Sequence, residues 1–123
     1  MPNYLTVRDV VIVIFPQQNP QGREQVGYRP AIVVGVSDRV ATPRFDLIVV
    51  VPLTSDRGQT WAQSSPELYP RLVAGVAGLP RNSLVLLDQI RAIDLNRVVR
   101  YLGTLTSEQY SLIRDPLQIM LDL

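Results

Sequence analysis

The stretch PQQNPQGREQVGYRP, residues 16–30, connects two apolar runs and decides which kind of sheet they can form. The runs on either side, VVIVIF at 10–15 and AIVVGV at 31–36, are apolar throughout, which is typical of parallel strands buried on both faces. Parallel neighbours need a long crossover, usually a helix, but this stretch is rich in Pro, Gly and Asn and has no helical period. The sequence therefore predicts that the two strands run antiparallel.

Three further runs have the same short, β-branched character: LIVVVPL at 47–53, SLVLLDQI at 83–90 and VVRYLG at 98–103. Together the five runs predict a mainly β fold, a strongly curved antiparallel sheet or small barrel. Because a bare apolar face of this size would associate with other molecules, we expect a helix or a second subunit to cover its outer face.

The C-terminal stretch TSEQYSLIRDPLQIMLDL predicts an α-helix. Thr106 and Gln109 form a capping-box pattern at its start. Four apolar residues follow at helical spacing: Tyr110, Ile113, Leu117 and Met120. Pro116 predicts a kink or a restart of the helix at this point, because proline lacks the backbone N–H that a helix interior needs.

The remaining connections predict little regular structure. The long segment 56–82 is expected to hold one short strand near 68–72 and a mobile loop near Trp61. The stretch DLNR at 94–97 predicts a single helical turn.

Length and charge narrow the class of protein. With 123 residues, 46% of them hydrophobic, the chain is expected to form one domain over residues 1–123. The net charge of +1 is too small for long-range attraction to nucleic acid, so a nucleic-acid site would need a local cluster of arginines. The apolar runs are too short to span a membrane and the N-terminus has no signal-peptide pattern, so we expect a cytoplasmic protein without a membrane partner.

Three missing residue types limit the chemistry. The chain has no Cys, no His and no Lys, and all 12 basic residues are arginine. Disulfides, the usual transition-metal ligands and Schiff-base lysines are therefore excluded, which leaves only a hard cation held by carboxylates. Proton transfer has to rest on Asp, Glu, Tyr, a hydroxyl, water or the electrostatic effect of an arginine.

The segment REQVGYRP, residues 23–30, places a carboxylate, a glycine and an arginine within six residues. Gly27 permits a backbone turn and Pro30 fixes φ, so Arg29 is delivered from a defined strand edge. A guanidinium there suits phosphate binding and can stabilise the extra negative charge of a pentacoordinate phosphorane. Spacing alone, however, favours an ordinary surface ion pair between Glu24 and Arg29.

Two hydroxyls, Thr54 and Ser55, follow directly on an apolar strand that Pro52 ends. Hydroxyls at a strand end suit phosphate or ribose binding. Plain turn capping, with Asp56 and Gly58 completing a tight turn, is the commoner case.

A polar pair, Asp88 and Gln89, interrupts the apolar run at 83–90. A buried Asp88 would need an arginine or backbone amides as partners, because an unpaired buried carboxylate is costly. Gln89 could instead face a groove and read the edge of a base.

In this order and at these separations, three blocks resemble the MazF/PemK family of toxin endoribonucleases from type II toxin–antitoxin systems: REQVGYRPAIVV at 23–34, VVPLTS at 50–55 and SLVLLDQIRAID at 83–94. The start RDVVIVIFP and the ending YLGTLTSEQYSLI also match, so the resemblance covers nearly the whole chain. It implies an SH3-like, CcdB-type antiparallel barrel with a C-terminal α-helix, assembled as a homodimer. It also implies cleavage of single-stranded RNA without a metal or cofactor, giving a 2′,3′-cyclic phosphate and a 5′-hydroxyl, with a cognate antitoxin as partner.

The resemblance also implies roles for particular residues. Arg29 falls on the family's active-site arginine, Thr54 on its hydroxyl and Glu24 on an acidic residue that some members use as a base. Either Glu24 or Thr54 would take the proton of the attacking 2′-OH. Four residues would bind RNA, and the ring of one of them, Tyr28, would be available for stacking on a base. They are Gln25, Tyr28, Ser55 and Gln89.

Two other functions stay open on the sequence. The same scaffold hosts non-catalytic inhibitors of protein targets such as DNA gyrase, as CcdB-like proteins are, and inert interaction modules. Arg29 and Thr54 flanking one groove favour the enzyme. For the dimer, the two-sided apolarity of the strands predicts a contact made by the outer strand faces and the C-terminal helix.

Overall fold

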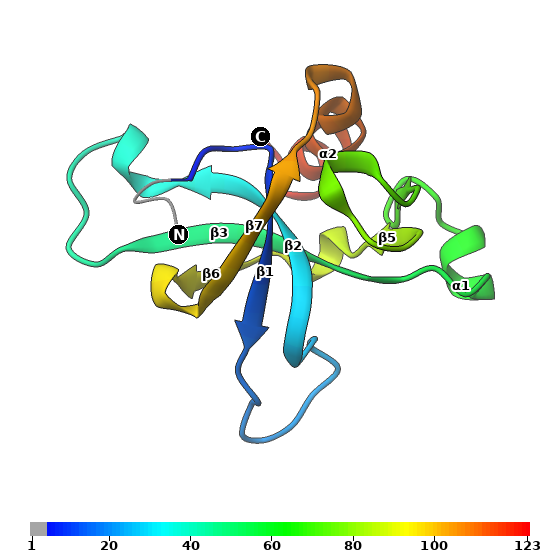
Figure 1. Ribbon diagram of the computed structural model, residues 1–123, viewed down its shortest axis with the longest axis horizontal. Helices are drawn as coiled ribbons and strands as arrows, with labels where there is room; N and C mark the ends of the chain where they lie inside the picture. The colour runs from blue at the N-terminus through cyan, green and yellow to red at the C-terminus, as the bar shows by residue number, and fades with distance from the viewer. Residues whose placement is uncertain (1–4) are drawn as a thin grey trace.

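A curved antiparallel sheet with one long helix against it makes up the computed structural model, which describes residues 5–123 (Figure 1). The strands are β1 Asp9–Phe15, β2 Gly27–Val36, β3 Leu47–Ser55, β4 Arg71–Leu72, β5 Ser83–Val85, β6 Arg91–Asp94 and β7 Val98–Thr104. The helices are α1 Thr60–Gln63 and α2 Ser107–Met120, with single 3₁₀ turns η1 Ser37–Arg39, η2 Val76–Gly78, η3 Leu87–Gln89 and η4 Leu95–Arg97.

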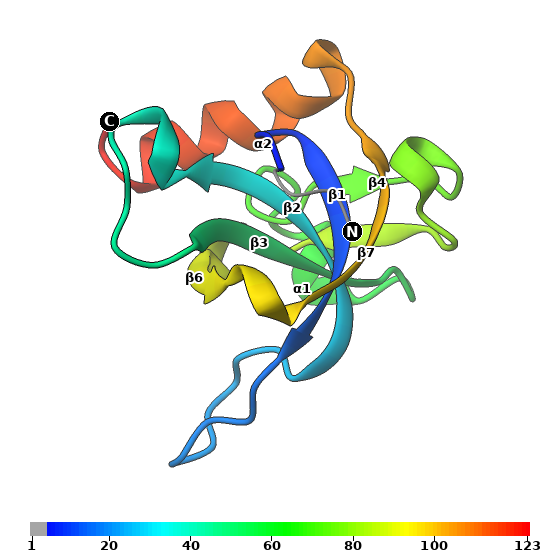
Figure 2. The same ribbon diagram turned by 60° about the vertical axis from the view of Figure 1, so that its left-hand side comes forward.

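The strands are joined in the order β4-β5-β3-β2-β1-β7, and β6 also pairs with β3. All these pairings are antiparallel, as the connection at residues 16–30 predicts. Register shifts interrupt the ladders of β1 with β7 and of β2 with β3. Such bulges increase the local twist, and the sheet curls into the half-barrel seen in Figure 2. The expected curved antiparallel fold is confirmed.

Two hydrophobic cores, one on each side of the central strands, explain why these strands are apolar at nearly every position. Neighbouring residues of a strand point to opposite faces. Val10 and Ile32 belong to one core, whereas Val11 and Ala31 belong to the other. Both faces are therefore buried within a single chain, although the sheet is antiparallel.

Helix α2 covers the first core. Its buried residues Tyr110, Ile113 and Leu117 join the core that contains Val10. Of the two covers expected for the outer face, the chain thus uses its own helix. Met120, which continues the same helical spacing, remains 39% exposed.

The N-terminus of α2 is capped as expected, but the predicted break at Pro116 is wrong. The backbone N–H of Gln109 donates to Thr106 Oγ1 (3.1 Å), and Thr106 N–H donates to Gln109 Oε1 (2.8 Å). The helix then runs through Pro116 to Met120. Pro116 leaves unpaired only the carbonyl of Leu112, whose side chain is 56% exposed, so water can reach that side while the buried side holds the helix together.

The run 83–90 is not one strand, which corrects the prediction. Strand β5 pairs its Val85 with Leu53, and β6 pairs its Arg91 with Val50 on the same edge of β3. Residues 86–90 therefore face only residues 51–52 of β3, and the surplus residues leave the ladder as the turn η3. Asp88 and Gln89 lie in this bulge, outside the sheet.

The long segment is more ordered than predicted. A helical turn, α1, occupies the place of the loop expected near Trp61, and the strand expected at 68–72 is only Arg71–Leu72. The predicted turn at 94–97 is present as η4, where Asn96 N–H donates to Asp94 Oδ1 at 2.9 Å. Within residues 5–123, no helix is long and apolar enough to cross a membrane.

Candidate active site

Arg29 lies near the start of β2, opposite Val13 of β1. Gly27, at φ +81°, makes the backbone turn that brings the chain into this strand. The Arg29 Nε–H donates to the carbonyl of Val26 at 3.2 Å, and this is the guanidinium's one hydrogen bond in the described part of the chain. The side chain is thus fixed at Nε, and its two terminal nitrogens are free to donate to an anion.

The ion pair between Glu24 and Arg29 that spacing favours is not formed. The side-chain ion pairs among residues 5–123 are Arg71–Asp56 and Arg114–Asp115. Arg29 is therefore not neutralised by the carboxylate nearest to it in sequence.

Thr54 lies in the last part of β3, beyond the point where β2 separates from this strand. The last pair of these strands in this direction is Ala31 with Pro52. Arg29 lies two residues before Ala31 and Thr54 two residues after Pro52, so strand alternation places both on the face shared by this last pair, where the two strands diverge. The structure therefore brings these two predicted residues to one end of the half-barrel.

Neither hydroxyl of the Thr54–Ser55 pair makes a side-chain hydrogen bond to residues 5–123. The turn that follows is capped instead by Asp56, whose Oδ1 accepts from Gly58 N–H at 3.0 Å. The turn is therefore capped by Asp56 and not by the Thr54 or Ser55 hydroxyl, which was the commoner explanation. The Thr54 hydroxyl is available to a ligand.

Gln89 holds the loop that carries Glu24. Its Oε1 accepts from the Gln25 N–H at 2.8 Å, and its Nε2 donates to the Arg23 carbonyl at 3.4 Å. These bonds fasten the residues on both sides of Glu24, whose side chain is exposed. Both polar atoms of the Gln89 amide are used inside the protein in this arrangement.

A cavity of about 480 Å³ opens beside this loop, lined by Glu24, Asp88, Gln89 and Arg91 among others. Sequence reasoning missed Arg91. Its guanidinium carbon lies 5.4 Å from the centre of the Phe15 ring, and its Nη1 is buried without a hydrogen-bond partner in the described chain. Gln25 Oε1 is likewise buried and unpartnered. In the sequence, the one feature that points to Arg91 is its position two residues after the polar pair Asp88 and Gln89.

Tyr28 and Ser55 are the immediate neighbours of Arg29 and Thr54, so strand alternation places them on the opposite face. Tyr28 is 69% exposed. The structure therefore gathers Arg29 and Thr54 on one face and leaves these two predicted RNA-binding residues on the other.

Asp88 finds a partner of a different kind from those expected. Tyr69 donates its hydroxyl to Asp88 Oδ2 at 2.7 Å, and this hydrogen bond, with burial and the carboxylate charge, raises the pKa of Tyr69 above its usual value. Trp61 packs edge-on against the Tyr69 ring with centroids 4.9 Å apart. The long segment 56–82 is thus tied to the η3 bulge.

A family model of PemK-like, MazF-like toxins of type II toxin-antitoxin systems matches residues 6–121. The chain belongs to this family. It superposes on MazF from Deinococcus radiodurans with a TM-score of 0.73 at 23% identity, covering 98% of this chain and 100% of that one. An endoribonuclease in complex with its cognate antitoxin from a mycobacterial species gives 0.67 at 19% identity, covering 98% and 97%. A MazE-MazF structure from Deinococcus radiodurans gives 0.66 at 22% identity, covering 98% and 99%.

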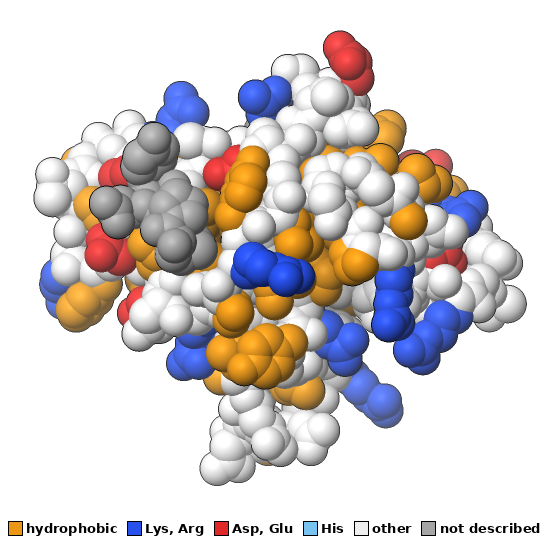
Figure 3. All heavy atoms as spheres, in the orientation of Figure 1, with side chains coloured by type: hydrophobic (Ala, Val, Ile, Leu, Met, Phe, Trp, Pro, Cys, Tyr) orange, Lys and Arg blue, Asp and Glu red, His pale blue; other side chains and the backbone are white. Residues whose placement is uncertain are grey.

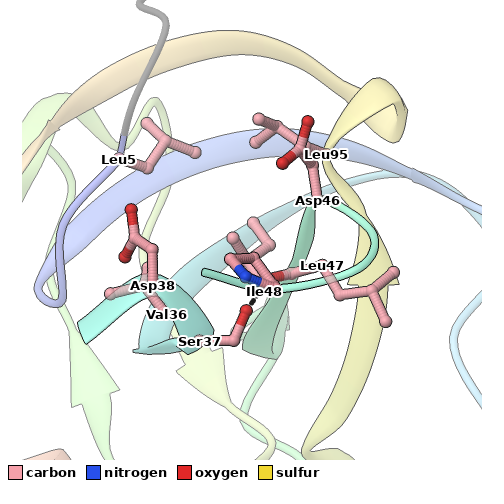
Figure 4. Close-up of a pocket in the computed structure, with 9 residues that line it drawn as sticks. Leu5, Val36, Ser37, Asp38, Asp46, Leu47, Ile48 and Leu95 are labelled. Carbon is pink, nitrogen blue, oxygen red and sulfur yellow. Dashed lines mark hydrogen bonds between the residues drawn. The ribbon is translucent and has the colours of Figure 1, made fainter. Parts of the chain in front are cut away.

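Elsewhere in this MazF-like toxin, the cavity drawn in Figure 4 is poorly suited to an anionic ligand. It measures about 100 Å³ and lies where β3 begins, at the other end of that strand from Thr54. Its charged lining residues are Asp38 and Asp46, with no arginine among them. In the part of the chain that the structure describes, no three His, Cys, Asp or Glu side chains are grouped to hold a metal ion.

Proposed function

We propose that this toxin is a sequence-specific endoribonuclease that cleaves single-stranded RNA without a metal ion. The observation that carries the proposal is the Arg29 guanidinium, which is fixed through Nε and has its terminal nitrogens unbonded in the described chain. It lies on the same face of the sheet as the unengaged hydroxyl of Thr54. An oriented guanidinium and a hydroxyl on one face are suited to binding the charged oxygens of a phosphodiester.

In the proposed reaction, the ribose 2′-oxygen attacks the adjacent phosphorus while its proton passes to a base. The bond from phosphorus to the 5′-oxygen of the next nucleotide breaks, and that oxygen takes a proton from water and leaves as a 5′-hydroxyl. The other product ends in a 2′,3′-cyclic phosphate. Arg29 stabilises the added negative charge of the phosphorane, which is the largest electrostatic demand of this reaction.

Glu24 and Thr54 are the two candidates for the base. Glu24 lies on a loop fastened on both sides by Gln89, so its carboxylate is carried by a positioned backbone. Thr54 lies on the same face of the sheet as Arg29 and can alternatively orient the phosphate through its hydroxyl.

The RNA strand is proposed to pass Gln25, Tyr28, Ser55 and Gln89. The exposed Tyr28 ring suits stacking on an unpaired base. Gln89 contributes chiefly by holding the 23–25 loop, since its amide is already bonded there.

A cognate antitoxin is the proposed protein partner, in the cytoplasm. The family to which the chain belongs is defined by toxin-antitoxin systems, and structures of similar fold were solved as complexes with an antitoxin or with MazE. We propose that the antitoxin covers the groove at Arg29 with an extended acidic segment, and that the toxin is a homodimer.

The test is incubation of purified protein with a long single-stranded RNA in excess EDTA, followed by mapping of the cut ends. We expect cuts at one short sequence, with cyclic-phosphate and 5′-hydroxyl ends. Arg29→Ala should abolish them, while Arg100→Ala, an exposed strand arginine of β7, should cut like the wild type.

Intact RNA from folded wild-type protein would reject the enzyme and favour an inhibitor of a protein target. A fully active Arg29→Ala variant would reject the assigned site.

A further inference from the structure

Arg71 lies on the same row across the sheet as Thr54. Thr54 of β3 pairs with Leu84 of β5, and Leu84 pairs on its other side with Arg71 of β4. Directly paired residues point to the same face, so Thr54, Leu84 and Arg71 form one row. Arg29 belongs to the same face by strand alternation, beyond the last pair of β2 with β3. Two strand spacings separate Thr54 from Arg71, roughly 10 Å at about 4.8 Å each.

Arg71 is held in the same way as Arg29. Its Nε–H donates to Asp56 Oδ2 at 2.5 Å, and its terminal nitrogens make no hydrogen bond to residues 5–123. The arginine side chain is 66% exposed, whereas that of Asp56 is 10% exposed. The backbone N–H of Gly58 holds the pKa of Asp56 below its usual range, with Arg71 adding to the effect, so the holding carboxylate is charged at neutral pH.

A cavity of about 440 Å³ lies beside this guanidinium. Its lining includes Asp56, Tyr69, Arg71, Asn82 and Leu84, which combine polar groups with an aromatic ring and an aliphatic side chain. This volume falls within the range of small-ligand pockets, and the mixture suits a nucleotide, which has a charged phosphate and a flat base.

The surroundings of the cavity are basic on the side that faces solvent. Figure 3 shows several arginine side chains between the lower part of β2 and the segment leading to α1, and an acidic side chain beside them near that segment. The net charge of +1 is thus unevenly distributed, as a local RNA site requires.

We propose that Arg71 binds a backbone phosphate of the RNA strand on one side of the cleaved bond, and that the cavity between β3, β5 and α1 receives that nucleotide. This inference rests on the proposed function and extends the site beyond Arg29 and Thr54. Asp56 acts as a positioning residue that orients the terminal nitrogens of the Arg71 guanidinium.

The chain supplies a matched control for this arginine. Arg114 on α2 donates its Nε–H to Asp115 at 3.1 Å, with both side chains more than half exposed. Arg114→Ala therefore removes the same charge and the same kind of ion pair, but at a helix surface away from the row.

The experiment uses a short RNA carrying the mapped cut site, blocked by a 2′-O-methyl group on the attacking ribose. Its Kd is measured for the wild type, Arg71→Ala, Arg71→Gln and Arg114→Ala over a series of KCl concentrations. We expect both Arg71 variants to bind about tenfold more weakly. The slope of log Kd against log salt should fall by about 0.7, the value for one phosphate contact on a single strand.

A second series shortens the RNA from each end in turn. Removing the nucleotide that reaches Arg71 should make the wild type and Arg71→Ala bind equally. Arg71→Gln keeps most of the side-chain volume, and a melting curve for each variant separates a loss of binding from a loss of folding.

Three results would overturn the inference. The first is an equal salt slope for Arg71→Ala and Arg114→Ala. The second is a difference in Kd between the wild type and Arg71→Ala that persists on the shortest RNA. The third is that Arg71→Ala loses affinity for poly-glutamate but not for RNA. The last would assign the cavity to an acidic protein partner. If the wild type itself neither cleaves nor binds RNA, the proposed function fails; if it cleaves and Arg71→Ala matches it, only this inference fails.

Discussion

At the residue scale, Arg29 and Arg71 are each held by one acceptor of the protein. The Val26 carbonyl binds Nε of the first, and the Asp56 carboxylate binds Nε of the second. A free arginine loses much rotamer freedom when it binds an anion, and an arginine that is already oriented loses less. Fixing Nε therefore favours phosphate binding without using the terminal nitrogens that make the bidentate contact.

Asp56 should make stability depend on pH. Its pKa is lower in the folded protein than the ordinary 3.8, so its contribution is present above 3.8 and is lost as pH falls through the lower folded value. Asp56→Asn should lower the melting temperature at neutral pH, and the difference from wild type should shrink as the pH falls below 3.8.

Melting curves at a series of pH values measure this difference. Asp115→Asn is the control, because its ion pair with Arg114 is exposed and is expected to contribute little at any pH. A melting-temperature gap for Asp56→Asn that stayed constant into strong acid would contradict the prediction.

At the element scale, the η3 bulge connects the sheet to the loop that carries Glu24. Surplus residues between β5 and β6 leave the ladder, and Gln89 among them reaches the backbone of residues 23–25. Asp88 in the same turn binds Tyr69 of the long segment. One bulge thus contacts both of the segments that flank the proposed RNA path.

Gln89→Ala is expected to act through Glu24. Loss of both bonds to the loop frees the carboxylate from its position, so kcat should fall by about tenfold or more with a smaller change in KM. Gln89→Glu keeps an acceptor for Gln25 N–H, the shorter of the two bonds, and should recover part of kcat.

Steady-state rates on the mapped RNA over a range of pH values test this prediction. If Gln89 instead read a base, Gln89→Ala would raise KM, leave kcat unchanged and relax the choice of cleavage sequence. That outcome would remove the positioning role.

At the scale of the whole molecule, the chain covers one face of its central strands with its own helix. This leaves the outer surface of α2, with Leu112 56% and Ile119 82% exposed, as the apolar part of the expected dimer contact. A groove of about 410 Å³ runs along these residues, between α2 and Pro66 and Pro70. We expect this surface to take part in the homodimer.

Sedimentation at micromolar concentration should therefore give twice the chain mass of 13.8 kDa. Ile119→Asp should shift the protein toward monomer, because a charge in an apolar contact is costly. Val40→Asp, at a position 91% exposed beside η1, is the control and should leave the dimer intact. A wild-type monomer, or dissociation by both variants alike, would count against the helix surface.

The features that the sequence determined by itself are those set by local chemistry. The stretch at 16–30 excludes a helical crossover, and the Thr106–Gln109 box starts the last helix, because each depends only on residues close in sequence. The order of the three blocks indicates the same family as the family model that matches residues 6–121.

Tertiary structure decided every feature whose partner is distant in the chain. Pro116 does not break α2 because the helix packs against the sheet on both sides of this proline. The run 83–90 divides because β3 has too few residues to pair with all of the residues of the run. Glu24 and Arg29 are near in sequence but unpaired, whereas Arg71 reaches the row of Thr54 through Leu84 on another strand. The physical reason is that strand register, which places side chains in rows, is fixed by contacts between distant segments and not by the spacing of residues along one of them.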